Sequence, residues 1–90
     1  MLLPVKKVAI FLIILGMGKG QSIISLMDIS EINAVVSEIR RLTALSPEIQ
    51  RSVWDEFKGL GYEDKMKPSE TLTIIRFLFN GSKIGDKARR

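Results

Sequence analysis

Apolar residues recur at helical spacing in the middle of the chain. Between residues 28 and 42 the apolar positions are Ile32, Val35, Val36, Ile39 and Leu42. Steps of three and one place them along one side of a helix, whereas a strand would need strict alternation. Asp28 and Glu31 have the spacing of a capping box, in which each side chain bonds the other's backbone N–H. This segment is therefore predicted to be a helix that starts at Asp28.

A second amphipathic segment follows a serine and a proline. Ser46 is a favoured helix cap, and Pro47 suits the first helical position because an N–H there would have no helical partner. The apolar stripe behind them consists of Ile49, Val53, Phe57 and Leu60. Gly59 and Gly61 are expected to end this helix.

Three other helices are predicted from shorter or more uniformly apolar segments. They cover roughly residues 5–15, residues 19–27, and a stretch from a cap at Ser69 to a stop at residues 80–81. Gly16, Gly18 and Gly20 are expected to form the turn between the first two helices. The chain is thus predicted to be all-α, with a helical interaction domain over residues 1–81. Residues 82–90 are expected to be the basic start of a further helix or a linker.

The most hydrophobic stretch, residues 8–15, allows three interpretations. A helix buried on all sides by its neighbours is favoured. With Lys6 and Lys7 ahead of it, the run also resembles a secretory signal peptide, whose cleavage would leave a shorter secreted helical protein. Lys19 argues against that, since it lies where a cleavage site needs small neutral residues. A membrane span needs roughly 20 apolar residues, and this run is about half as long.

Composition excludes several classes of chemistry. The chain has neither cysteine nor histidine, which rules out disulfides, thiolate metal sites and a Ser-His triad. The net charge is +4, but residues 82–90 carry four basic residues against Asp86 alone. Residues 1–81 are nearly neutral, with ten basic and nine acidic side chains. A nucleic-acid reader would carry a basic stripe on the fold itself, so nucleic acid is not an expected partner.

No motif for catalysis or cofactor binding emerges. The glycine-rich residues 16–20 match neither phosphate-loop pattern, so we interpret them as an inter-helix turn rather than a phosphate site. Asp55 and Glu56 are helical neighbours that point in different directions, and Glu63 and Asp64 lie in a charged loop. No catalytic residue, metal or cofactor is therefore predicted, and the chain is not expected to be an enzyme.

Large apolar side chains exceed what so small a core comfortably holds. Those that compete for space with the helical stripes are Leu2, Leu3, Phe11, Ile14, Ile24, Ile29 and Phe79. Apolar surface left uncovered on a small domain often marks a partner site. A well-filled core with a few scattered exposed aliphatics is the other interpretation.

Five stretches of the chain follow one another in the order of a known family. Residues 6–16 are similar to the pattern "K-A-A-I-L-L-x-x-L-G", residues 26–32 to "L-x-x-x-E-I/V", and residues 36–42 to "x-x-E-I-x-x-L". Residues 45–57 resemble "V-S-P-E … V-L-E-E-F", and residues 75–88 resemble "L-x-x-x-L-G-x-x-x-A". In this order and spacing, the chain resembles the N-terminal domain of the flagellar motor switch protein FliG.

The resemblance implies a small superhelical bundle of about five helices that serves bacterial motility and chemotaxis. In that family the domain anchors the rotor switch complex to the membrane (MS) ring by binding the C-terminal helices of the ring protein FliF. It implies a cytoplasmic, peripheral position at the inner face of the cell membrane, without insertion, and contacts with other switch subunits or neighbouring copies. The expected apolar groove residues are Phe11, Ile13, Ile14, Ile24, Ile32 and Val36.

The alternative is a cytosolic regulatory domain of an MgtE-like magnesium transporter, which shares this kind of helical superhelix. Such a domain would be expected to carry acidic faces that bind Mg²⁺. The slightly basic body of the chain argues against it.

Overall fold

Five helices make up the part of the chain that the structure, a computed structural model, describes: residues 3–42 and 45–81. They are α1 (Pro4–Leu15), α2 (Met17–Ile24), α3 (Ile29–Arg41), α4 (Pro47–Gly59) and α5 (Pro68–Gly81). These two ranges contain no strand, so the all-α prediction is confirmed. The basic segment 82–90 lies outside the described residues.

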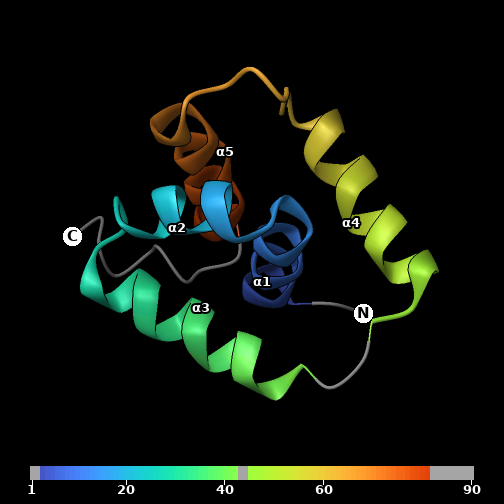
Figure 1. The fold of residues 1–90 in the computed structure, drawn as a ribbon, viewed down its shortest axis with the longest axis horizontal. Coiled ribbons are helices and arrows are strands. Elements are labelled where there is room, and N and C mark those ends of the chain that lie inside the picture. The colour runs from blue at the N-terminus through green and yellow to red at the C-terminus, as the bar shows by residue number, and fades with distance from the viewer. Residues whose placement is uncertain (1–2, 43–44, 82–90) are drawn as a thin grey trace.

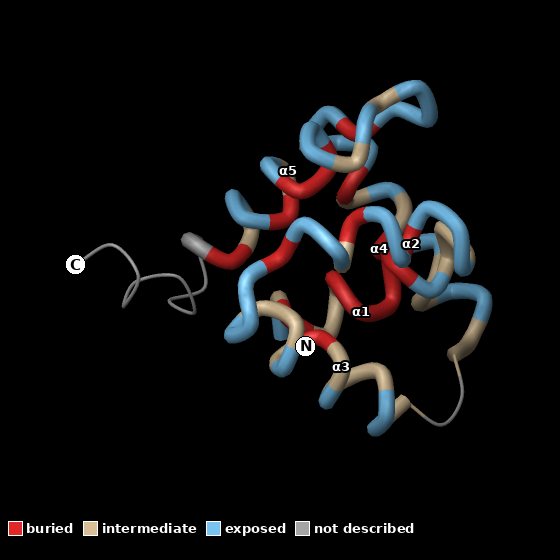
Figure 2. The backbone as a smooth tube through the Cα atoms, turned by 60° about the vertical axis from the view of Figure 1, so that its left-hand side comes forward, coloured by how far each residue is buried: buried red, intermediate tan, exposed pale blue. Residues whose placement is uncertain are grey.

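Helix α1 is the centre of the fold. It packs against each of the other four helices, and α2 packs in addition against α5 (Figure 1). Residues 8–12 are all buried, and Figure 2 shows this middle part of α1 as a buried stretch inside the molecule. A helix segment that is covered all round needs no polar face, so the buried-helix interpretation is confirmed for residues 8–12, whereas Ile13 is exposed. Within the described ranges, no helix has the length and apolar character needed to cross a bilayer.

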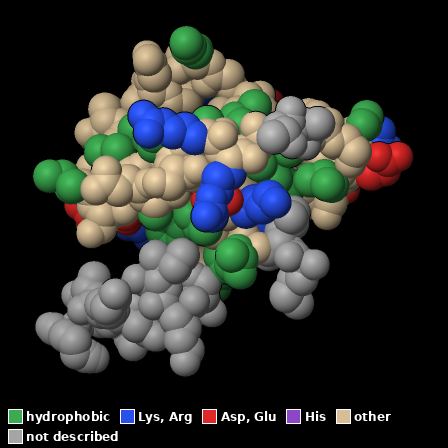
Figure 3. Space-filling model, turned by 90° about the horizontal axis from the view of Figure 1, so that it is seen from below, with side chains coloured by type: hydrophobic (Ala, Val, Ile, Leu, Met, Phe, Trp, Pro, Cys, Tyr) green, Lys and Arg blue, Asp and Glu red, His purple; other side chains and the backbone are tan. Residues whose placement is uncertain are grey.

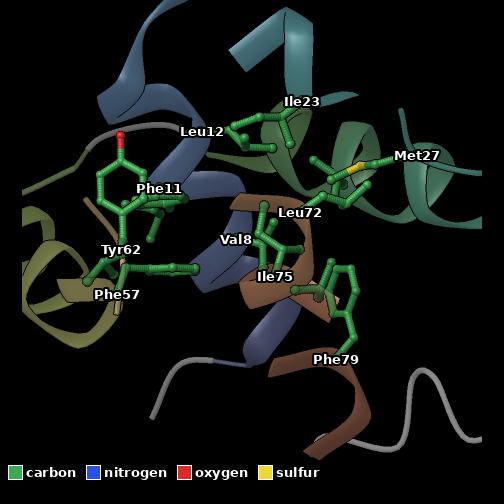
Figure 4. Packing of buried hydrophobic residues seen from close by; sticks show 14 residues of the cluster. Val8, Phe11, Leu12, Ile23, Met27, Phe57, Tyr62, Leu72, Ile75 and Phe79 are labelled. Atoms are coloured by element: carbon green, nitrogen blue, oxygen red, sulfur yellow. The ribbon is translucent and has the colours of Figure 1, made fainter. Parts of the chain in front are cut away.

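An aromatic cluster joins α1 to α4 and to the loop behind it. The ring of Phe11 stacks on that of Phe57, with centroids 3.9 Å apart and an angle of 6° between the planes (Figure 4). Tyr62 meets Phe11 edge-on at 5.0 Å, and Trp54 lies 6.1 Å from Phe11. The other side of α1 is covered by α5, whose buried apolar side chains are Leu72, Ile75 and Phe79.

The predicted caps of α3 and α4 are confirmed. The Asp28 carboxylate accepts from the backbone N–H of Glu31 at 2.8 Å, and the Glu31 carboxylate accepts from that of Asp28 at 2.9 Å. The Ser46 hydroxyl accepts from the N–H of Ile49 at 3.1 Å. Each interaction involves residues only three apart, so both helices begin where the local sequence predicts.

Helix α5 starts earlier than predicted. The expected cap, Ser69, lies inside the first turn, and Pro68 is the first helical residue. The backbone N–H of Lys67 donates to the Glu70 carboxylate at 2.9 Å, which takes the place of the predicted serine cap. Proline favours this position because its fixed φ already suits a helix.

The turn between α1 and α2 is shorter than predicted, because Gly16 alone makes it. With φ of +91° and ψ of 173°, Gly16 changes the direction of the chain within one residue, so α2 begins at Met17 and contains Gly18 and Gly20. The helix ends at Ile24, whereas the sequence pattern places its end near Met27. Inside α2, a Cβ on Gly20 would lie 3.2 Å from the carbonyl oxygen of Leu12, so this glycine lets α2 approach α1 closely.

An ion pair ties α5 to the start of α3. Arg76 donates to both carboxylate oxygens of Glu31, from Nε at 2.8 Å and from Nη2 at 3.0 Å. These hydrogen bonds, helped by the N–H of Asp28, hold the pKa of Glu31 below its ordinary value despite partial burial. The same contact raises the pKa of Arg76.

Replacing Arg76 by glutamine is expected to lower the free energy of unfolding by about 0.5–1 kcal/mol at neutral pH, since the pair is partly exposed. Folding lowers the pKa of Glu31, so the stability from the pair is present above the unfolded pKa of this carboxyl. It is lost as the pH falls through the folded pKa. Urea unfolding of both proteins at about pH 7 and about pH 3 should show the difference shrinking in acid. Arg51→Gln, on the exposed surface of α4, is the control. An equal loss for Arg76→Gln at both pH values would contradict the prediction.

Candidate protein-binding surface

A hollow lies between α2 and α3, over the C-terminal half of α1. Both helices pack on α1 rather than extensively on each other, so they leave a space between them with α1 as its floor. This space is a pocket of about 400 Å³. It is lined by Leu12, Ile13, Gly16, Met17, Gly20, Gln21, Ile24 and Ile39. None of these residues is charged, so the pocket suits an apolar partner. We call it the α2–α3 groove.

Large apolar side chains remain exposed at this groove. Met17, the first residue of α2, is 76% exposed, and Ile13, near the end of α1, is 43% exposed. Ile24 and Ile39, from α2 and α3, are half-buried. Covering such side chains with an apolar partner removes their surface from water, which favours binding by roughly 25 cal/mol per Å² before the costs of association.

Of the six residues that the sequence suggests for a groove, only some line the α2–α3 groove in the structure. Ile13 and Ile24 line the α2–α3 groove. Ile14, Ile32 and Val36 are half-buried and do not line it. Phe11 needs a correction: it is fully buried in the aromatic cluster, because its side of α1 faces α4. Phe11 is therefore a core residue and offers no surface to a partner.

Sequence reasoning misses three apolar lining residues of the groove: Leu12, Met17 and Ile39. Ile39 belongs to the apolar stripe of α3, but the stripe does not tell which of its members lie next to α1. Met17 is not predicted as a groove residue because the glycines on either side of it favour a turn over residues 16–20. A methionine between two glycines at the start of a helix is the signal that could point to it.

Other parts of the surface mix apolar and charged side chains. Figure 3 shows one face on which hydrophobic side chains are scattered among lysines and arginines rather than joined into one patch. Leu26, Ile29 and Phe77 are exposed apolar residues that do not line the groove. In the described ranges, no three potential metal-ligating side chains cluster together.

Comparison with known protein families decides the identity of the fold. A family model, the FliG N-terminal domain, matches residues 1–88, nearly the whole chain. The chain belongs to the FliG N-terminal domain family. Neither the curated proteins nor the solved structures gave a match to this chain. Membership confirms the resemblance inferred from the order of the helical segments.

As a FliG N-terminal domain, the chain is a component of the flagellar motor, in the switch complex of the rotor. This family is a structural part of the motor rather than one known for catalysis. The match favours the motor interpretation over the alternative of a magnesium-transporter domain.

Proposed function

We propose that this domain anchors the rotor switch to the MS ring by binding a helical C-terminal peptide of FliF in the α2–α3 groove. The observation that carries the proposal is the groove itself: apolar, free of charged lining residues, and about 400 Å³ in volume. The domain would then lie at the cytoplasmic face of the cell membrane, held there through FliF rather than by insertion.

The shape of the groove supports a helical ligand. Its walls are two helices and its floor is a third, an arrangement that accepts the apolar face of an amphipathic helix. Such a peptide would place apolar side chains at helical spacing between Met17 and Ile39. A peptide that orders only on binding has a free-energy cost to overcome, and buried apolar contacts are the main means of doing so.

Introducing a carboxylate at the rim of the groove is expected to abolish or strongly weaken this binding. Met17→Asp would force a charge to lose its water beside an apolar partner, and we expect the affinity for the FliF peptide to fall by roughly tenfold or more. The domain should stay folded, because an acidic side chain is favourable in the first turn of a helix. Calorimetric titration with the C-terminal FliF peptide of the same organism, alongside circular dichroism, measures both properties.

Leu3→Asp is the matched control. Leu3 is also an exposed apolar residue at the start of a helix, and α1 has no side-chain cap there. Asp at this site is expected to stabilise the domain by about 1 kcal/mol through capping, while peptide affinity stays unchanged. The proposal fails if the unaltered domain does not bind the peptide at high micromolar concentration. It also fails if Met17→Asp binds as well as Leu3→Asp.

A further inference from the structure

A second hollow lies on the opposite side of α2. It is a pocket of about 370 Å³ between α2, the loop after α4 and the start of α5. Its lining differs from that of the α2–α3 groove, because polar side chains stand among the apolar ones. The polar members are Lys19, Ser22, Tyr62 and Thr71. We call it the Lys19 pocket.

The polar groups of the Lys19 pocket differ in whether their hydrogen-bond donors are already used within the protein. The hydroxyl of Ser22 donates to the carbonyl of Gly18 at 3.1 Å, and that of Thr71 donates to the carbonyl of Lys67 at 3.3 Å. Both hydroxyls have therefore used their single donor inside their own helix or at its start. They can accept a hydrogen bond from a ligand but have none left to donate.

Two donors in this pocket remain available. The Lys19 ammonium donates to the backbone carbonyl of Asp64 at 3.3 Å, and an ammonium has two further hydrogens. Tyr62 is 3% exposed, and its hydroxyl points away from Phe57 (Figure 4). No hydrogen bond of that hydroxyl is found among the described residues, and it does not count among buried polar atoms that lack a partner. Lys19 and Tyr62 together thus offer hydrogen bonds to an acceptor in the pocket.

The positive charge of the Lys19 pocket also favours a ligand group that is a hydrogen-bond acceptor. Lys19 is the only charged residue in its lining. The contacting loop carries Glu63 and Asp64, and neither carboxylate forms an ion pair with Lys19 in the described structure. A cation and a free phenolic hydroxyl, next to Leu15, Ile23 and Met66, match a carboxylate carried on a short apolar stem.

We propose that the Lys19 pocket receives an aspartate or glutamate side chain of the same partner peptide whose apolar face occupies the α2–α3 groove. This inference rests on the proposed function and adds an acidic anchor to it. The two hollows flank one helix of eight residues. Because a helix is about 10 Å wide, a peptide in the groove can reach across the end of α2 to the pocket with its flanking residues. The groove would supply apolar contact, and the pocket would fix the register of the peptide.

Titration of the FliF C-terminal peptide into Lys19→Gln and Lys19→Arg tests the charge. We expect Lys19→Gln to weaken binding by roughly tenfold, and Lys19→Arg to keep most of the affinity because it keeps the charge. The affinity of the unaltered domain should fall with added salt, and that dependence should be weaker for Lys19→Gln. Tyr62→Phe, which removes only the hydroxyl, should weaken binding by a few-fold.

A double-mutant cycle identifies the acidic residue. Each Asp or Glu of the peptide is replaced in turn by its amide, and one replacement should cause the same loss as Lys19→Gln without adding to it. If the unaltered domain binds but Lys19→Gln binds equally well, the acidic anchor is wrong and the proposed function stands. If every acidic replacement adds fully to Lys19→Gln, the anchor is likewise wrong. If the unaltered domain does not bind the peptide at all, both proposals fall together.

Discussion

Replacing Phe11 by alanine is expected to lower the free energy of unfolding by about 3–5 kcal/mol. Phe11 is fully buried and lies between Phe57 and Tyr62 at ring distances of 3.9 and 5.0 Å. Alanine would leave a cavity at the junction of α1 and α4 and remove both ring contacts. A domain of this size has only about 5–15 kcal/mol of stability in total, so the variant should be close to unfolding.

Urea denaturation followed by tryptophan fluorescence measures this effect. Trp54 is the single tryptophan, and it lies 6.1 Å from Phe11, so it reports on the same cluster. Circular dichroism gives an independent probe of the helices. Ile13→Ala is the matched control on the same helix, because Ile13 is 43% exposed and should lose much less. If the two variants lost equal stability, the aromatic cluster would not be the centre of the core.

Gly16→Ala is expected to destabilise the domain by about 1–3 kcal/mol, although it adds only a methyl group. The cause is conformational rather than steric, since a Cβ at this position would meet nothing within 4 Å. With φ of +91° and ψ of 173°, Gly16 occupies a region of backbone space that is essentially restricted to glycine. Any other residue must strain its backbone or shift α2 relative to α1.

Gly18→Ala separates this cause from a general effect of adding a methyl group. Gly18 lies within α2, and a Cβ there would also meet nothing within 4 Å. Because alanine favours helix over glycine, this change is expected to stabilise the domain by up to about 1 kcal/mol. Thermal unfolding of the pair should therefore show shifts of opposite sign. Two shifts of the same sign would mean that the backbone of Gly16 is not strained by a side chain.

The starts of α3 and α4 are predictable because the residues that cap each helix lie next to its first turn in the sequence. Asp28 accepts from the backbone N–H of Glu31 and Ser46 from that of Ile49, each only three residues further along the chain. The burial of residues 8–12 in α1 is predictable too, since a helical segment without a polar face is favoured inside the fold.

The remaining features depend on residues that meet only in the folded chain. The apolar run of α1 gives no sign of which side faces α4, so the sequence suggests a partner surface for Phe11, which lies in the core instead. The glycine-rich segment contains three glycines, and the sequence does not tell that Gly16 alone has positive φ while Gly18 and Gly20 continue a helix. The Lys19 pocket combines α2 with residues more than forty positions later, and no local motif marks such a site.

The central position of α1 has a consequence for synthesis on the ribosome. This helix leaves the exit tunnel before the other four described helices, and α4 begins only at Pro47 and α5 at Pro68. Until both have been translated, the most apolar segment of the chain lacks two of the four helices that cover it. A nascent chain that stops after α3 would expose that surface, which favours aggregation and recognition by chaperones. Among the five described helices, α5 is therefore the one whose synthesis completes the burial of α1.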